Sequence, residues 1–172
     1  PQSGSSFKPF IYSAALNHGY NLSTLINDAP IVFEDENLES AWRPQNYTGE
    51  FYGPISLREA LTKSVNIVSI KLLRELGLDK THNFLENFGF QKSRLPNDLS
   101  LALGSGNFSP IEMSRAYSVI ATNGYIPDIY FIDSIKDRNG NIIYSHDNFD
   151  RQKEISAFPW LDTLEMNENR PY

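Results

Sequence analysis

Two residues near the amino end of the chain, Ser5 and Lys8, have types and a spacing that could activate a nucleophile. Residues three apart on a helix lie on one face, so the Ser5 hydroxyl and the Lys8 amine can meet. A serine hydroxyl is a weak nucleophile until a base removes its proton. A partly desolvated lysine with a lowered pKa can be that base. The pair therefore indicates acyl transfer, with Ser5 as nucleophile and Lys8 as base.

The same pair has an ordinary structural explanation. Random placement of the serines and lysines of this chain gives roughly 0.7 Ser-x-x-Lys matches, so the motif alone is not specific. A serine at the start of a helix is commonly an N-cap, and a lysine in the first turn is commonly solvated. The surrounding sequence has to decide between the two interpretations.

A second serine close to Lys8 could relay a proton, and an asparagine amide could hold a substrate carbonyl. The candidates are Ser64-Val65-Asn66 and Ser105-Gly106-Asn107. For the second we favour a glycine-containing turn that leads to a helix cap at Ser109. For Ser64 and Asn66, the alternative to a catalytic role is a solvated helix face.

Composition excludes several function classes. The chain has 172 residues, 40% of them hydrophobic and 21% charged, which is ordinary for a globular protein. A net charge of −6 without a basic run argues against a nucleic-acid partner. There are no cysteines, and the three histidines lack the spacing of metal ligands, so we expect no metal and no cofactor.

Periodicity predicts a mainly helical chain with one β-hairpin near 129–145, an α+β class. Helices are expected over 5–17, over 57–76 from the capping box at Ser56 and Glu59, and from Asp79 to Gly89. Ser109 and Pro110 predict the start of another helix, with Met113, Ala116, Tyr117 and Ile120 as its buried stripe. The hairpin is predicted by the Asn139-Gly140 turn between β-branched runs.

Several segments resemble the transpeptidase domain of class A, bifunctional penicillin-binding proteins, most similar to the 1A type. Motifs in the right order are more specific than any one of them. The segments lie between about residues 4 and 145: Gly4–Tyr12, Trp42–Tyr47, Gly53–Asn66, Leu101–Ser105, Ser109–Met113 and Ala121–Gly124.

The resemblance implies the mainly helical part of a serine β-lactamase/penicillin-binding transpeptidase fold. Ser5 would be acylated, Lys8 would accept its proton, Ser64 would shuttle a proton and Asn66 would hold the acyl-donor amide. It also implies that Ser64-Val65-Asn66 lies on a turn between two helices, and we therefore expect a break in the helix predicted over 57–76.

The family's third motif, Lys-Thr-Gly, is absent from this sequence. Lys80-Thr81-His82 comes nearest, but it lies at a predicted helix start and lacks the glycine, so we reject it. We therefore expect an incomplete domain, with 1–146 as its amino-proximal part and 147–172 as an irregular tail or linker, and we expect the isolated chain to be inactive.

The partners that the resemblance implies are the D-Ala-D-Ala end of a peptidoglycan stem peptide and β-lactam antibiotics. The full-length protein would lie at the periplasmic face of the bacterial inner membrane, held only by an N-terminal anchor outside this sequence. Two alternatives remain open: a D,D-carboxypeptidase or β-lactamase-like hydrolase, and a catalytically silent module.

Overall fold

The structure is a computed structural model, and it describes residues 1–32 and 42–146. The described residues fall into two compact units. The first contains those of Pro1–Glu86 and Phe90–Ser109, and the second contains Asn87–Gly89 and those from Pro110 onward. The predicted tail, 147–172, lies outside the described residues, so the boundary at 146 stays a prediction.

The chain begins with a 3-10 helix, η1 (Gly4–Phe7), which continues directly into α1 (Lys8–Asn17). Its tight geometry has a local cause at Pro9. An α-helix would need the residue at 9 to donate to the Ser5 carbonyl, and proline has no N–H. The Lys8 N–H donates to that carbonyl instead, which is the i+3 bond of a 3-10 helix. The helix predicted over 5–17 is thus confirmed, but its first turn is of the 3-10 type.

The uninterrupted helix predicted over 57–76 is wrong, and the break expected near Ser64 is confirmed. The structure has α2 (Leu57–Thr62) and α3 (Asn66–Leu76). At the start of α2, Ser56 Oγ accepts from the Glu59 N–H at 3.2 Å, as the capping box predicts. At its end, Val65 N donates to Ala60 O and Ser64 N donates to Leu61 O. These two bonds form a Schellman motif, which ends α2 and redirects the chain.

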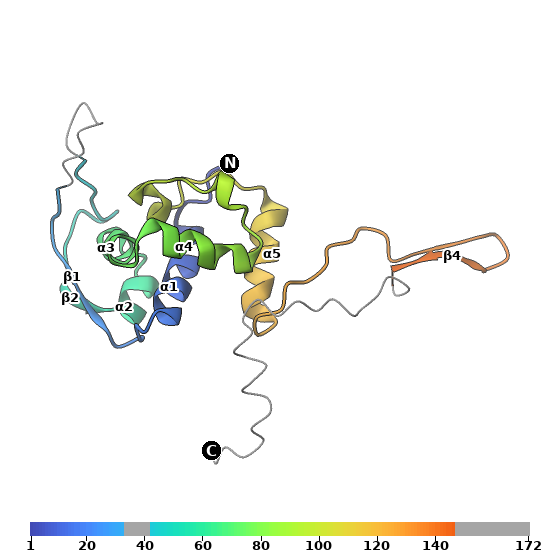
Figure 1. The fold of residues 1–172 in the computed structure, drawn as a ribbon, viewed down its shortest axis with the longest axis horizontal. Helices are drawn as coiled ribbons and strands as arrows, with labels where there is room; N and C mark the ends of the chain where they lie inside the picture. The colour runs from blue at the N-terminus through green and yellow to red at the C-terminus, as the bar shows by residue number, and fades with distance from the viewer. Residues whose placement is uncertain (33–41, 147–172) are drawn as a thin grey trace, which may run out of the picture. The chain divides into compact units, whose positions relative to one another are not determined.

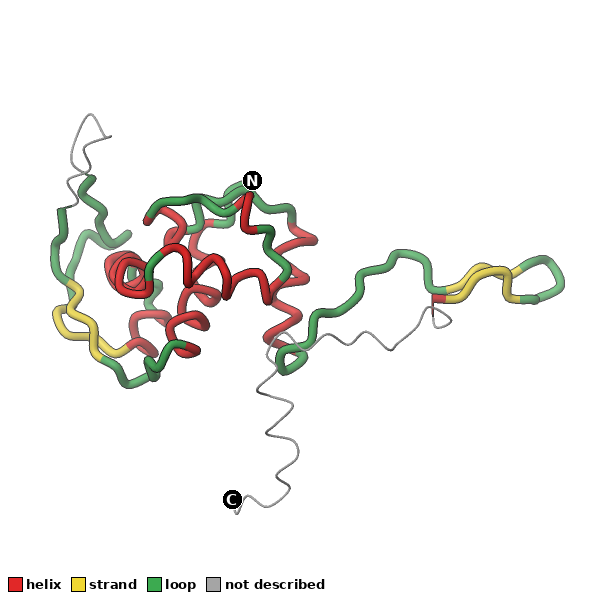
Figure 2. The backbone as a smooth tube through the Cα atoms, viewed as in Figure 1, coloured by secondary structure: helices red, strands yellow, loops and turns green. Residues whose placement is uncertain are grey.

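Three helices pack together in the first unit: α1, α3 and α4 (Leu78–Leu85) (Figure 1). Short 3-10 turns follow at η2 (Glu86–Phe88), η3 (Lys92–Arg94) and η4 (Leu99–Leu103), and η4 packs against α3. Beside α3 lies an antiparallel pair, β1 (Leu25–Asp28) and β2 (Gly53–Ser56), with Ile26 opposite Ile55. The first unit is therefore mostly helical, as Figure 2 also shows.

An aromatic cluster of four buried phenylalanines anchors the helix that carries the Ser-x-x-Lys motif. Phe7 stacks on Phe108 with ring centroids 5.6 Å apart, and Phe90 lies 5.2 Å from both Phe7 and Phe10. Because Phe7 precedes Lys8 and Phe10 follows it by two residues, burial of these rings fixes both sides of the lysine. Aromatic pairs of this kind contribute roughly 0.5–1.5 kcal/mol each beyond the area that they bury.

The second unit contains α5 (Pro110–Ala121) and the predicted hairpin, β3 (Ser134–Lys136) with β4 (Ile142–Ser145). The stripe predicted for α5 is partly wrong. Ala116 and Val119 are buried, whereas Tyr117 and Ile120 are 39% and 46% exposed. Ala116 and Val119 are three residues apart and therefore lie on one side of the helix. The buried face is thus rotated around the helix axis relative to the predicted one.

Within residues 1–32 and 42–146, no helix is long and apolar enough to cross a bilayer. The same residues contain no group of three or more His, Cys, Asp and Glu side chains that could hold a metal ion.

Candidate active site

The structure brings Lys8, Ser64 and Asn66 together. Lys8 Nζ donates to the Ser64 carbonyl at 2.6 Å, to Ser64 Oγ at 3.0 Å and to Asn66 Oδ1 at 2.7 Å. A lysine ammonium has three N–H donors, so these three acceptors satisfy it completely. The side chain that sequence analysis paired with Ser5 is therefore also fixed to the Ser-x-Asn turn.

Burial changes the acidity of Lys8. The residue is only 1% exposed, and this desolvation lowers its pKa from 10.5 to about 8. A pKa near 8 leaves about one lysine in ten neutral at pH 7, compared with fewer than one in a thousand at an ordinary value. The site thus supplies a fraction of free amine that a solvated lysine would not.

The same contacts restrict where the neutral amine can direct its lone pair. The Ser64 carbonyl and Asn66 Oδ1 can only accept hydrogen bonds, so they retain two N–H groups. The third position faces a hydroxyl, which can donate as well as accept. The lone pair can therefore receive a proton from the Ser64 hydroxyl.

Ser64 itself has an unusual backbone. Its φ of 55° lies in the left-handed region, at the C′ position of the Schellman motif, where glycine is the usual residue. A residue with a Cβ pays roughly 1–2 kcal/mol for that conformation. Strain of this kind, held by surrounding structure, is typical of functional sites.

Ser5 lies in the first turn of η1 with an exposed side chain. Its hydroxyl makes no hydrogen bond to any residue in the described part of the chain, and in particular none to Lys8. In the first turn of a helix the backbone N–H has no acceptor within that helix, so it is available to a ligand. Ser5 thus presents a hydroxyl and an N–H donor to solvent.

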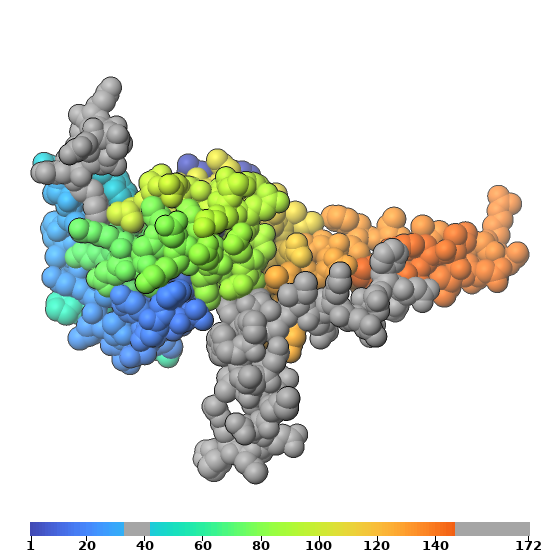
Figure 3. Space-filling model, in the orientation of Figure 1, coloured from blue at the N-terminus to red at the C-terminus, as the bar shows by residue number. Residues whose placement is uncertain are grey.

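The segment before Ser5 is held by Gly104 and by Gly106, which sequence analysis assigned only to a turn. Ser3 N donates to Gly106 O and Gly4 N to Gly104 O, at 3.2 and 3.0 Å. A Cβ added to Gly104 would lie 2.0 Å from the Gly4 carbonyl oxygen, so only glycine allows this approach. The segment 104–106 therefore positions the backbone that leads to Ser5; Figure 3 shows the first residues, in dark blue, beside yellow-green atoms.

The N-terminus of α3 has no capping side chain of its own, since its N-cap residue is Val65. The cap comes from Asn46, whose Oδ1 accepts from the N–H groups of Asn66 and Ile67 at 2.9 and 3.2 Å. The Asn66 side-chain amide donates one hydrogen to Gln45 O at 2.9 Å, and its second hydrogen makes no hydrogen bond within the described part of the chain. Sequence analysis missed Asn46 because nothing in its spacing marks it as a helix cap 20 residues away.

Lys80-Thr81-His82, rejected above as a counterpart of the missing motif, lies within α4. Thr81 and His82 are buried there, with Thr81 Oγ1 donating to Gly77 O and the His82 ring 3.1 Å from Pro96 O. These residues are structural.

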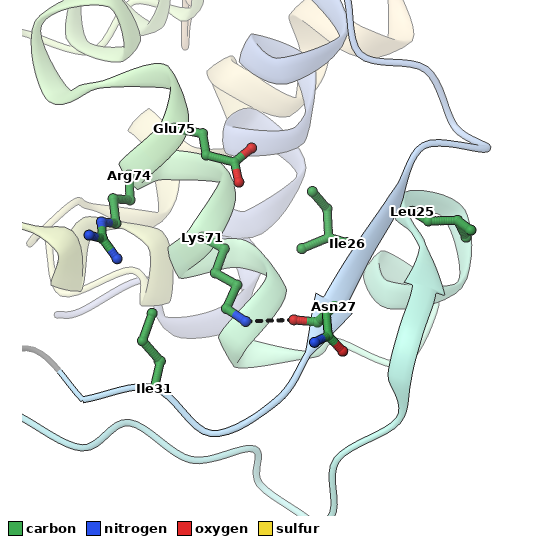
Figure 4. A pocket seen from close by; sticks show the side chains of 7 residues that line it. All are labelled: Leu25, Ile26, Asn27, Ile31, Lys71, Arg74 and Glu75. Carbon is green, nitrogen blue, oxygen red and sulfur yellow. Dashed lines mark hydrogen bonds between the residues drawn. The ribbon is translucent and has the colours of Figure 1, made fainter.

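A pocket of about 490 Å³ lies apart from these residues, between β1 and α3 (Figure 4). The Lys71 side chain extends from α3 toward β1, and its Nζ donates to Asn27 O at 2.6 Å. None of the predicted site residues lines it, so it does not belong to the candidate active site.

Comparison with known proteins identifies the family. Residues 2–159 match the model of the penicillin binding protein transpeptidase domain. The chain belongs to this family. A curated relative, penicillin-binding protein 1A of Pseudomonas aeruginosa, is 52% identical over 143 residues, which are 83% of this chain and 17% of that protein. The resemblance inferred from the motifs is thus confirmed.

Solved structures of the family agree with the fold. The crystal structure of penicillin-binding protein 1A from Haemophilus influenzae has a TM-score of 0.80 and 39% identity, over 84% of this chain and 22% of that one. PonA1 from Mycobacterium tuberculosis, solved in complex with penicillin V, has a TM-score of 0.72 at 24% identity, over 86% of this chain and 42% of that one. The predicted α+β transpeptidase fold is confirmed, and the chain spans less than a fifth of its Pseudomonas relative.

Proposed function

We propose that this chain carries the nucleophile and proton-transfer groups of a D,D-transpeptidase that cross-links peptidoglycan stem peptides. The observation that carries the proposal is the set of three hydrogen bonds from Lys8 Nζ to Ser64 and Asn66. It joins the two motifs of the transpeptidase family around one desolvated amine. A solvated lysine on a helix surface would make no such set of contacts.

In the proposed acylation, neutral Lys8 accepts the proton of the Ser5 hydroxyl while Ser5 Oγ attacks the carbonyl of the D-Ala-D-Ala amide. The oxyanion that forms receives a hydrogen bond from the Ser5 backbone N–H. The proton then passes from Lys8 through Ser64 Oγ to the departing nitrogen, and D-alanine leaves. The free hydrogen of the Asn66 amide holds a carbonyl of the acyl-donor peptide.

The second half-reaction reverses the proton path. The amine of a neighbouring stem attacks the acyl carbon of the Ser5 ester and gives its proton to Lys8 through Ser64. The bond between that carbon and Ser5 Oγ breaks, Lys8 returns a proton to Ser5 Oγ, and the cross-linked amide leaves. A β-lactam would acylate Ser5 by the same first step, through opening of its ring. The complex of PonA1, a protein of the same fold, with penicillin V supports binding of a β-lactam.

The location of the full-length protein, at the periplasmic face of the inner membrane, is part of the same proposal. So is inactivity of the isolated chain, because this sequence has no Lys-Thr-Gly to complete the oxyanion hole. The complete polypeptide that contains this chain should react with penicillin, whereas the 172-residue chain alone should not.

The test is release of D-alanine from a D-Ala-D-Ala peptide by the complete polypeptide, with and without an amine acceptor. A transpeptidase should transfer the acyl group to the amine, and Ser5→Ala should abolish release. Ser6→Ala is the matched control, because Ser6 is the neighbouring serine and its Oγ donates to the Ser3 carbonyl. Release that depends on water alone would indicate the hydrolase alternative, and full release by the Ser5→Ala variant would refute the proposal.

A further inference from the structure

The predicted site residues do not explain what holds the Ser64–Asn66 turn against Lys8. The turn joins α2 to α3, and α3 has no N-cap of its own. Uncapped N–H groups at a helix N-terminus need an acceptor from elsewhere. Asn46 supplies it with a single oxygen, which accepts from both Asn66 N and Ile67 N.

Asn46 can do this only in one orientation of its amide. Its Nδ2 donates to the Asp28 carboxylate, at 3.0 and 2.8 Å from the two oxygens, and to Glu50 O at 2.9 Å. Both hydrogens are therefore used, and Oδ1 must point at α3. Rotation of the amide by 180° would turn its NH₂ group toward two other N–H donors.

Asp28 in turn is fixed from a second side. Its Oδ2 accepts from the Tyr52 N–H at 2.9 Å, and its side chain is 0% exposed. Asn46 is 6% exposed, so the two side chains form a buried amide–carboxylate pair. A buried carboxylate without donors would be costly, which makes this pair sensitive to the identity of both members.

We propose that Asp28 and Asn46 are positioning residues of the active site, which set the location of Asn66, and thereby of Lys8, through the N-terminus of α3. The inference rests on the proposed function. The hydrogen bonds of Lys8 go to Ser64 and Asn66 rather than to either residue, so both act through Asn66. The neighbouring Gln45 carbonyl, which accepts from the Asn66 side-chain amide, completes the arrangement.

The experiment exchanges the pair in the complete polypeptide and measures the rate of acylation by a fluorescent penicillin. Asn46→Asp alone places two carboxylates against each other, and it should slow acylation roughly 10–100-fold, since small displacements of reacting groups have effects of that size. The double variant Asp28→Asn/Asn46→Asp restores one amide facing one carboxylate, while residue 46 still offers an oxygen to α3. Its rate should return to within about fivefold of wild type, the remainder reflecting the lost bond to Glu50 O.

Ser56→Ala is the matched control. It removes the N-cap of α2, at the end of that helix away from Ser64, and should lower thermal stability while the acylation rate stays unchanged. The control thus distinguishes slower acylation caused by a displaced Asn66 from slower acylation caused by a general loss of stability.

Acylation by Asn46→Asp at the wild-type rate overturns the inference, as does a double variant that folds but is as slow as Asn46→Asp. If Asn46→Asp does not fold, the double variant decides: recovery of folding and rate supports the inference, and failure of either overturns it. Failure of the proposed function is distinguishable, because the wild-type penicillin adduct would then lie on a residue other than Ser5.

Discussion

Lys8 Nζ lies 2.7 Å from Asn66 Oδ1, although 58 residues separate them in the sequence. This bond joins the first residue of α1 to the first residue of α3. Lys8 is thereby removed from water and still has all its N–H groups bonded. The arrangement explains how one lysine can be buried, ordered and partly neutral at physiological pH.

The lowered pKa of Lys8 predicts the pH dependence of acylation. Only the neutral amine can accept the Ser5 proton, so the rate of penicillin acylation by the complete polypeptide should rise with pH to a plateau, with a midpoint near 8. A rate that keeps rising to pH 10 would show that Lys8 is not desolvated as described. Lys8→Arg should remove activity at every accessible pH, because the guanidinium stays protonated.

The same shift affects stability. The charged form of Lys8 is disfavoured in the folded state, because its pKa there is about 8 compared with 10.5 in an unfolded chain. Its contribution to stability should therefore increase as pH rises from 8 to 10.5, by roughly 3 kcal/mol. The free energy of unfolding is measured against pH for wild type and Lys8→Met. Between pH 8 and 10.5 the wild-type value should rise by this amount relative to that of the variant. Parallel curves of the two proteins would contradict the prediction.

Ser64→Gly should separate stability from activity. Glycine adopts a φ of 55° without the cost of a Cβ, so the variant should be more stable than Ser64→Ala by about 1 kcal/mol. Both variants lack Oγ and should lose acylation to the same extent. Denaturant unfolding measures the stability of the two variants, and penicillin labelling measures their acylation. Equal stabilities would show that the left-handed backbone is not strained.

Gly104→Ala should damage the site through the backbone of Gly4. Its Cβ would lie 2.0 Å from Gly4 O, and we expect a loss of more than about 2 kcal/mol together with slower acylation. Gly140→Ala is the control, because Gly140 lies in the hairpin turn with a positive φ of 86° but has open space around it. It should lose only about 1 kcal/mol and retain its acylation rate. Equal effects of the two substitutions would mean that φ alone matters.

Much of the site could be predicted from the sequence because its motifs are short and local. Ser5 and Lys8 lie on one helix turn, and the capping box at Ser56 fixes where α2 begins. Periodicity missed the break at Ser64, since Leu61, Val65 and Val68 keep helical spacing across it. Only the resemblance to the family indicated the turn there.

The parts that could not be predicted depend on contacts between distant segments. Asn46 caps a helix 20 residues away, and Gly104 holds a segment about 100 residues before it. The residues next to Asn46 and Gly104 in the sequence form no pattern that would predict either contact. On α5, the predicted stripe was rotated because periodicity gives the spacing of a buried face more reliably than its phase, as exposed Tyr117 and Ile120 show.

The central claim, that Ser5 is the acylated nucleophile, is tested most directly by locating the penicillin adduct. The complete polypeptide is incubated with penicillin and digested, and the peptides are sequenced by mass spectrometry. The proposal predicts one added penicillin on Ser5, lost in Ser5→Ala and retained in Ser6→Ala. An adduct on any other residue, or one that persists in Ser5→Ala, would contradict it.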